Sequence, residues 1–482
     1  MFSKLGAILK SDFFLYLSPS IVKAGVSLLI LVPITTYFLE PEDFGLFALL
    51  IALAMPIKVF ASAGSRWVIG GNYVNCDDAE RGRLLFNIIL FEFILRTTLA
   101  VILAFAAQPI LTLVMSVENK QYIELFLLSL LALWFNSIWP VVSYLMTVQR
   151  KPGYYAFLSM VQLVASVITT VTCFWFFEMG IETLFYALIV TNVTSLIFEF
   201  VYVYQFLDFT ISKKWMKEIF RVAMHSAPNS LAEMISTMSE RIIIQTFVGL
   251  AALGIYSHSQ QYQSIFKMAN GAMSNTMTPT ALQVYSKGLN HTPIIKAFES
   301  WYGVLACLGV FLALFTDNII NLLTHGKFVD AIPLVLIWYL LSYTVSHGIP
   351  YAQFLMAQKK SYVLMYTQFI PTIFGLVLLI IAVHYSGIIA AAISVVFTNA
   401  LIQFSRYIIA KRMGYKPVGE KAFMYSVFIY SLIVIFELFV KPSLAVEVLS
   451  FILVTLIIFK YYKLPNSMSA INIVPQQIKT TI

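Results

Sequence analysis

The sequence predicts an all-α integral membrane protein with about 14 transmembrane helices, built from two six-helix lobes that are parallel pseudo-symmetric repeats, plus two C-terminal helices. Three observations support this fold class. The chain of 482 residues is 60% hydrophobic and 11% charged. Its mean hydropathy of +0.84 exceeds that of soluble globular domains. Apolar stretches recur with short breaks from Phe13 to Tyr462, which leaves no room for a soluble catalytic domain.

The apolar stretches divide into about fourteen spans, because some 20 apolar residues form a helix that crosses the hydrocarbon core of a bilayer. The first stretch continues for about 25 residues and lacks a small-residue cleavage site, so we interpret it as a retained helix and not as a signal peptide. The predicted spans cover residues 14–38, 44–66, 84–106, 121–147, 153–177, 182–205, 219–247, 253–280, 297–316, 329–355, 361–384, 387–410, 422–440 and 443–462.

The distribution of basic residues among the loops predicts the orientation. An even number of spans puts both termini on one side of the membrane. Loops on that side hold most of the Lys and Arg residues, for example Arg150-Lys151 and Lys411-Arg412. The opposite loops hold Lys120, Lys327 and Lys441. Because an excess of Lys and Arg marks the cytoplasmic face, we expect both termini in the cytoplasm.

An internal repeat organises the chain. Identical residues recur at an offset of 209 residues, as in Pro19 and Pro228, Gly45 and Gly254, Lys58 and Lys267, Gln149 and Gln358, and Lys151 and Lys360. We expect a first six-helix lobe over residues 1–210, a second over residues 211–415, and two additional helices with a cytoplasmic tail over residues 416–482. Each repeat has an even number of spans, so the repeats are parallel. Two such lobes with a cleft between them are the usual frame for alternating-access transport.

Charged residues inside the spans indicate where a substrate binds. A charge at membrane depth costs roughly 3 kcal/mol or more, so such residues normally face a bundle interior or an aqueous cavity. Helical periodicity puts polar residues on one stripe in each of the first two spans of both repeats. These four helices are predicted to wall one cationic cavity. The predicted substrate-binding residues on or beside their stripes are Lys23, Lys58, Arg66, Arg241 and Lys267.

Three acids inside the spans, Glu92, Glu233 and Glu240, are candidates for coupling transport to an ion gradient. Glu92 also lies four residues before Arg96, an arrangement that suits an ion pair on one helix, so buried pairing is the alternative to coupling. Arg241 follows Glu240 directly, and adjacent residues do not face each other on a helix. A structural ion pair of Arg241 would therefore need an acid on another span.

Other interpretations of these polar residues stay open at the level of sequence. Stripes of Ser and Thr often serve only to pack helix against helix. Lys23 and Arg66 lie near the cytoplasmic interface, where long side chains reach out to water. Glu199 and Arg406 are repeat partners near helix ends, and we expect them at the interface.

The sequence contains no signature of an enzyme or of a bound cofactor. It has no GxxxxGK[ST] loop for phosphates, no HExxH motif and no cluster of Cys and His. Cys76, Cys173 and Cys307 are scattered, which suggests neither a disulfide framework nor a metal site. We expect no catalytic residues, no metal, no cofactor and no nucleic-acid partner.

Two segments resemble a known family. The stretch from the proline of SAPNSL through SERIIIQTFVGLAALGIYSHSQQY is similar to the seventh and eighth helices of Wzx-type oligosaccharide flippases. PITTYFLEPEDFGLFAL is similar to their first two helices. These flippases form part of the polysaccharide transporter family, within the multidrug/oligosaccharidyl-lipid/polysaccharide exporter superfamily. In one respect the chain departs from the family, whose charged pair is commonly Asp-Arg, whereas here it is Glu240-Arg241.

The resemblance implies a flippase of the bacterial inner membrane. Such a protein moves a polyprenyl-diphosphate-linked oligosaccharide, as in O-antigen and lipopolysaccharide synthesis, from the cytoplasmic to the periplasmic leaflet by alternating access coupled to an ion gradient. The cations would offset the diphosphate, and Tyr256, Tyr262 and Trp67 would stack on sugar rings. By analogy, the last two spans would form a groove for the polyprenyl tail. Expected partners are the lipid-linked substrate, the membrane, a glycan polymerase and a chain-length regulator.

Three alternatives compete with this interpretation. A multidrug or cation exporter of the same superfamily should have an acidic and aromatic cavity, whereas cations predominate here. A membrane-embedded glycan polymerase or ligase should carry long periplasmic loops, whereas the outer loops here are short. A flippase for the peptidoglycan precursor lipid is the closest alternative, and charge alone does not separate it from an oligosaccharide flippase.

Overall fold

The computed structural model describes residues 19, 21–61, 68–69, 72–73, 76–115, 120–136, 138–149, 151–286, 288, 292–358, 360–415, 420–440 and 444–462. These residues form helices and connecting loops and contain no strand. Nine helices among them are long and apolar enough to cross a membrane. The prediction of an all-helical, multi-pass membrane protein is therefore confirmed, while the count of fourteen spans stays a prediction.

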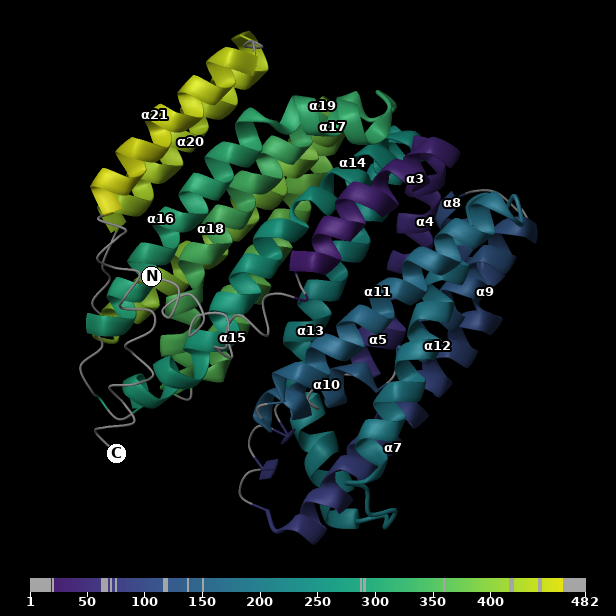
Figure 1. Ribbon diagram of the computed structural model, residues 1–482. Coiled ribbons are helices and arrows are strands. Elements are labelled where there is room, and N and C mark those ends of the chain that lie inside the picture. Colours follow the sequence, from purple (N-terminus) through teal and green to yellow (C-terminus); the bar gives the residue numbers. More distant parts are fainter. Residues whose placement is uncertain are drawn as a thin grey trace. The chain divides into compact units, whose positions relative to one another are not determined.

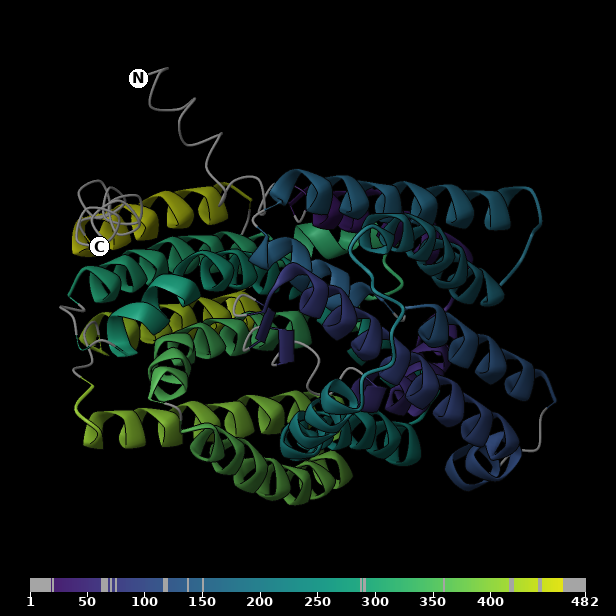
Figure 2. The same ribbon diagram turned by 90° about the horizontal axis from the view of Figure 1, so that it is seen from below.

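The chain divides into two compact units, Met1–Ser257 and His258–Ile482, and Figures 1 and 2 show the helices of each unit running alongside one another in a bundle. The division follows packing, whereas the predicted boundaries at 210 and 415 follow the repeat and stay predictions. The elements of the first unit are η1 (Ser27–Leu31), α3 (Val32–Phe38), α4 (Pro41–Ala54), α5 (Pro56–Ala61), α7 (Asp78–Phe105), α8 (Ala107–Met115), α9 (Lys120–Phe135), α10 (Trp139–Val148), α11 (Pro152–Trp175), α12 (Glu182–Tyr204), α13 (Lys213–Val248) and the first part of α14 (Leu250–Tyr262).

Local sequence explains where these helices begin. Helix α4 starts with a capping box. The Glu40 carboxylate accepts a hydrogen bond from the Asp43 backbone amide, and the Asp43 carboxylate accepts one from the Glu40 backbone amide. Pro41 occupies the first turn. Helix α7 begins at Asp78, before the apolar run itself, because acidic residues are favourable at a helix N-terminus. Helix α13 begins after Ser212, whose side chain accepts a hydrogen bond from the Trp215 amide.

The core of the first unit lies where α7, α10, α11, α12 and α13 meet. Apolar side chains on these helices are fully or almost fully buried against one another, which is what anchors the start of α13 to the rest of the unit. They include Leu84, Leu85, Ile88, Val141, Leu145, Leu158, Val203, Trp215 and Ile219.

Helices α4 and α14 approach each other at two glycines. A Cβ atom on Gly45 would lie 2.0 Å from the Leu250 carbonyl oxygen, and one on Gly254 would lie 1.6 Å from the Pro41 carbonyl oxygen. Only glycine allows backbones to come this close. Leu250 and Gly254 stand at the repeat offset from Pro41 and Gly45, so each repeat contributes the same two positions to the contact. Such reciprocity is what a two-fold relation produces.

The second unit contains the rest of α14 and seven further helices. They are α15 (Ser264–Ser286), α16 (Thr292–Leu314), α17 (Thr316–Thr324), α18 (Ile332–Ala357), α19 (Ser361–Arg412), α20 (Glu420–Val440) and α21 (Leu444–Tyr462), with the short helix η3 (Val329–Ala331) before α18. Helix α18 packs against α15, α16, α17, α19 and α20. Helices α20 and α21 contact each other and cover α16 (Figure 1).

Two predicted spans run together as α19, with a break at Gly387. This residue has φ of 66° and ψ of −151°, a conformation that side-chain-bearing residues rarely adopt. The break falls at the predicted boundary between spans 361–384 and 387–410. Helices α8 and α17, by contrast, occupy stretches that were predicted as loops. Both are short amphipathic segments, and α8 packs on α9 while α17 packs on α18.

Candidate functional site

Two of the predicted substrate-binding cations belong to the first unit and are exposed. Lys23 lies on the helical segment before η1, and Lys58 lies in the last turn of α5. Helix α5 follows a break in the second span at Met55 and Pro56, and it packs on α7, α9 and α13. The break separates the Lys58 segment from the apolar helix α4, so the lysine sits on a short element of its own.

Three predicted residues fall outside the described part of the chain, in whole or in part. Arg66 and Trp67 lie outside the described residues. The backbone at Glu233 belongs to α13, but its side chain lies outside the described part. Their proposed roles stay predictions.

Glu240 and Arg241 have separate surroundings. Glu240 is 7% exposed, and its carboxylate accepts a hydrogen bond from the Tyr256 hydroxyl, which ties α13 to α14. The Arg241 Nη1 donates to the Thr237 carbonyl oxygen at 3.2 Å, and its buried Nε has no hydrogen-bond partner among the described residues. The two therefore face different neighbours, as expected for adjacent residues on a helix.

Lys267 is exposed on α15, in the second unit. Ser274 and Thr278, two polar residues of the stripe predicted on this helix, have hydroxyl oxygens 3.3 Å apart. Gln353 on α18 donates to the Thr278 hydroxyl at 2.7 Å. This part of the stripe is used for packing α15 on α18, which was the alternative interpretation of the uncharged polar residues.

Tyr256 and Tyr262, which were expected to stack on sugars, are both 1% exposed. The Tyr256 hydroxyl bonds to Glu240, and the Tyr262 hydroxyl lies 3.3 Å from the Nε2 atom of His258. Protein covers both rings in this conformation, so their polar ends serve buried hydrogen bonds here.

Glu92 and Arg96 form a buried ion pair on α7. Their side chains are 2% and 0% exposed, and the Arg96 Nη2 lies 3.8 Å from the Glu92 Oε2. The Arg96 Nη1 also donates to the Leu133 carbonyl oxygen on α9 at 3.2 Å. The predicted pairing at this spacing is confirmed.

The structure adds a polar chain that the sequence did not reveal. Lys23 Nζ donates to Gln162 Oε1 at 3.3 Å, Gln162 Nε2 donates to Ser195 Oγ at 2.7 Å, and Ser195 Oγ donates to the Glu199 carboxylate. Glu199 is 2% exposed, so its carboxylate is buried within the protein, while its expected depth near the membrane interface stays a prediction. The spacing of Ser195 and Glu199 on one helix face was the available signal, but only the packing of α11 on α12 brings Gln162 to them.

The other residue expected at the interface, Arg406, is partly buried in the second unit. Its Nη2 donates to the Gln368 Oε1 at 2.9 Å within α19. Elsewhere in the same unit, a small apolar pocket lies between α15, α16, α18, α20 and α21. Its lining includes Leu305, Tyr339 and Ile458.

Comparison with known proteins connects this geometry to a family and a fold. A family model described as polysaccharide biosynthesis protein matches residues 9–284. No curated protein matches the chain in sequence.

Several solved structures share the fold at low sequence identity. A structure of the lipid II flippase MurJ in an inward closed conformation is 13% identical, with a TM-score of 0.72 over 94% of this chain and 98% of that chain. An inward-facing multidrug resistance MATE family transporter of the MOP superfamily is 15% identical, with a TM-score of 0.63 over 82% and 98% of the two chains. A mutant of the Vibrio cholerae MATE transporter VcmN is 14% identical, with a TM-score of 0.53 over 84% of this chain and 97% of that chain.

Proposed function

We propose, because the chain belongs to the polysaccharide biosynthesis protein family, that it is a flippase for a polyprenyl-diphosphate-linked oligosaccharide. It moves this lipid from the cytoplasmic to the periplasmic leaflet of the bacterial inner membrane, by alternating access. The fold shared with MurJ and MATE transporters supports a transport function. The absence of enzyme motifs in the sequence agrees with this proposal.

The observation that carries the proposal is the exposure of lysines within apolar spans. Lys23 belongs to the span Ile21–Phe38 and Lys58 to the span Pro41–Phe60, and both are exposed. A lysine at such a position is costly unless it faces water or an anion. The diphosphate of the substrate is an anion of this kind, and the Arg241 Nε is a further buried donor that could bind it.

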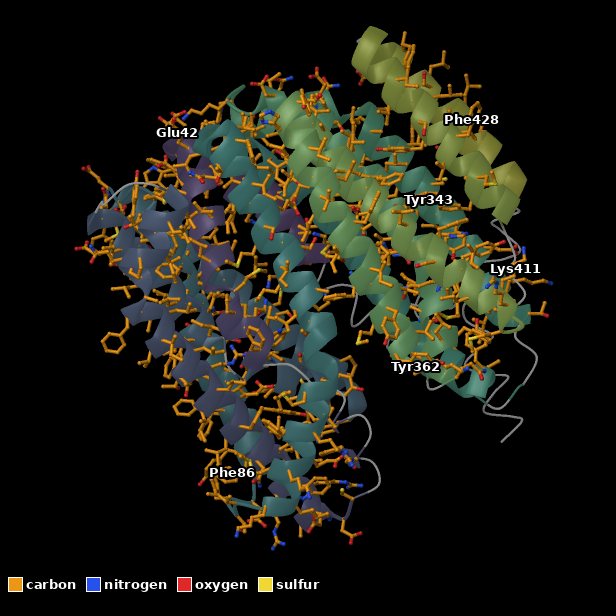
Figure 3. The ribbon with its side chains drawn as sticks, turned by 180° about the vertical axis from the view of Figure 1, so that it is seen from behind. Glu42, Phe86, Tyr343, Tyr362, Lys411 and Phe428 are labelled. Carbon is orange, nitrogen blue, oxygen red and sulfur yellow. The ribbon has the colours of Figure 1, made fainter. Side chains whose placement is uncertain are left out.

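In this proposal, the C-terminal helices α20 and α21 contact the polyprenyl tail of the substrate. Helix α20 exposes Met424, Phe428, Leu432 and Ile435 along one face, and Phe428 lies on this helix in Figure 3. Apolar side chains at this helical spacing are suited to contact with acyl or polyprenyl chains. The apolar pocket beside α20 and α21 supports the same role.

An ion gradient drives the cycle, and Glu92, Glu233 and Glu240 are the acids proposed to sense it. Both termini are cytoplasmic, and a glycan polymerase with a chain-length regulator receives the product. If flipping in reconstituted vesicles were indifferent to proton and sodium gradients alike, the proposal of gradient coupling would be wrong.

The decisive experiment compares a polyprenyl-diphosphate oligosaccharide, lipid II and a lipophilic cation as substrates. The purified protein is reconstituted in vesicles, and a membrane-impermeant quencher measures how fast a fluorescent lipid changes leaflet. We expect translocation of a polyprenyl-diphosphate oligosaccharide, and no accumulation of a lipophilic cation. Protein-free vesicles are the control. Failure to move any polyprenyl-diphosphate lipid would overturn the proposed function.

A peptidoglycan-precursor flippase is the second candidate, favoured by the match to MurJ over 94% of this chain. The same assay separates the two, because lipid II would then move faster than an oligosaccharide carried on the same lipid. A multidrug exporter is less favoured, since exposed lysines repel cationic drugs.

A further inference from the structure

The polar chain from Lys23 to Glu199 has a single direction. A lysine ammonium has only donors, so the side chain of Gln162 must turn its oxygen toward Lys23 and its amide nitrogen toward Ser195. The Ser195 hydroxyl then accepts from Gln162 and gives its own hydrogen to Glu199. Each bond therefore donates toward the carboxylate, and such chains strengthen bond by bond.

Among the described residues, two cations are linked to the buried acids Glu92 and Glu199, one directly and one through hydrogen bonds. Arg96 on α7 interacts electrostatically with both Glu92 and Glu199, so one guanidinium serves two buried carboxylates. Lys23, acting through α11, provides the second positive charge. Helix α10 carries no charged residue, and the acid of α9, Glu124, is exposed and lies well before Leu133, the residue of α9 that binds Arg96. Lys151, directly before α11, is exposed and lies over the ring of Tyr202, one turn beyond Glu199.

We propose that Glu199 is a proton-carrying residue whose protonation is linked, through Ser195 and Gln162, to the capture of an anionic diphosphate by Lys23. This inference rests on the proposed function, because it takes the diphosphate lipid as the anion. Glu199 is then a coupling residue that acts through Lys23 and does not touch the substrate. It is distinct from the three acids that the sequence singled out.

The linkage follows from electrostatics. When Lys23 turns to a diphosphate, the chain loses its first donor and the cluster loses one positive charge. A buried carboxylate without a compensating charge is strongly destabilised. One proton from water then binds the Glu199 carboxylate and removes the excess negative charge. Linkage is reciprocal, so protonation of Glu199 also releases Lys23 and strengthens diphosphate binding.

A binding experiment on the purified full-length protein tests this linkage. The probe is a short-chain polyprenyl diphosphate, and a pH indicator in weak buffer reports protons taken up on binding. The dissociation constant is measured between about pH 6 and pH 8. For the unaltered protein we expect proton uptake on binding, and an affinity that rises as the pH falls by up to about tenfold per pH unit, the limit for one linked proton.

The variants separate coupling from a merely structural role. Glu199→Gln keeps the shape of the side chain but cannot titrate, so it should bind the probe with proton uptake lost. Ser195→Ala keeps Lys23 and Glu199 and removes only the donor between them, so uptake and pH dependence should both decrease. Glu124→Gln, which changes an exposed acid on α9, is the matched control and should behave as the unaltered protein does.

Equal uptake in the unaltered protein and in Glu199→Gln would overturn the inference, since the linked proton would then lie elsewhere, while leaving the proposed function intact. The same holds if the unaltered protein binds the probe without uptake. Titration of the probe's own phosphates is common to all variants and cancels in the comparison. A protein that neither binds the probe nor moves any polyprenyl-diphosphate lipid would overturn both the inference and the proposed function.

Discussion

Lys58 and Lys267 stand at equivalent positions of the two repeats, and both are exposed. An anionic substrate would use an exposed lysine that recurs at the same position of both repeats. We predict that Lys58→Ala and Lys267→Ala each abolish surface glycan without lowering the amount of protein in the membrane. Arginine at either position keeps the charge and should retain part of the activity.

The control for these lysines is Lys213→Ala, which removes an exposed lysine from the first turn of α13. Its glycan level should be unchanged. Surface glycan is measured by gel staining of whole-cell extracts, and protein level by immunoblot of membranes. A normal level of surface glycan in both alanine variants would contradict the proposal of a cationic substrate site.

The sequence identified the ionisable residues within the spans but not the hydrogen-bond and ion-pair partners of each. The pair of Glu92 and Arg96 could be predicted because both partners lie on one helix at a fixed spacing. The burial of Glu199 could not be predicted, because its link to Gln162 through Ser195 depends on how α11 packs against α12. The hydrophobic periodicity of each helix does not determine how the two helices pack.

At the scale of elements, the close crossing of α4 and α14 leaves no room for a side chain at Gly45 or Gly254. A methyl group at Gly254 would lie 1.6 Å from the Pro41 carbonyl oxygen, so the two helices would have to separate. We predict that Gly254→Ala lowers the thermal stability of the detergent-solubilised protein by several degrees. Gly153→Ala on α11 is the control, because a Cβ there meets nothing within 4 Å. Equal melting temperatures for the two variants would show that the crossing relaxes freely.

The connection between α12 and α13 is held to the start of α7 by hydrogen bonds. Arg83 Nε donates to Asp208 Oδ2 at 2.8 Å, and the Thr210 hydroxyl donates to Asp208 Oδ1 at 2.6 Å. Asn87 donates to the Thr210 carbonyl oxygen at 2.9 Å and accepts from the Ser212 amide at 3.0 Å. These contacts fix the segment that joins the two repeats.

This connection gives a pH dependence with a definite sign. Hydrogen bonds from Thr210 and then from Arg83 hold the pKa of Asp208 below its ordinary value. The carboxylate therefore stabilises the folded protein above its unfolded pKa of about 3.9, and this contribution is lost as the pH falls through the lower folded pKa. Asp208→Asn should melt at a lower temperature than the unaltered protein at neutral pH, and the difference should shrink and vanish as the pH falls through the folded pKa of the carboxylate.

Thermal unfolding of the two proteins across this pH range is the measurement. Glu124→Gln is the matched control, because Glu124 is an exposed acid. A difference between Asp208→Asn and the unaltered protein that persists in acid would contradict this account of the carboxylate.

Most helix positions were predictable because the membrane imposes a length and a composition on each span. The break at Gly387 was predictable as well, since glycine marks a boundary between two apolar runs. The separation of α14 from α15 near Gln263 was not, because no proline or glycine marks it in the sequence. Short surface helices such as α8 depend on packing against α9 and carry too few residues for a periodic signal.

At the scale of the whole molecule, the basic loops predict the orientation in the membrane. The three natural cysteines, Cys76, Cys173 and Cys307, would first be replaced by serine. A new cysteine at Lys411, which is exposed at the end of α19 (Figure 3), should react with a membrane-impermeant maleimide only after cells are opened. A cysteine at Lys327 should react in intact cells whose outer membrane has been made permeable. The reverse pattern would show that the termini lie outside.

The fold as a whole was the most predictable level, and its likeness to MurJ and MATE structures persists at 13% to 15% identity. Hydropathy and repeat spacing determine such an architecture without much detail of side chains. The substrate is less accessible to this reasoning, because recognition depends on a few polar groups and on their neighbours and not on the fold.

The contact between Gly45 and Gly254 also bears on how such a protein could arise. Each side of the crossing supplies a carbonyl and, four residues later, a glycine. If the repeat arose by duplication, one half-length ancestor would have carried both surfaces, and two copies of it would already have fitted together there. Duplication and fusion of that ancestor would have kept the contact between α4 and α14, and the sequences of the two halves could then diverge elsewhere.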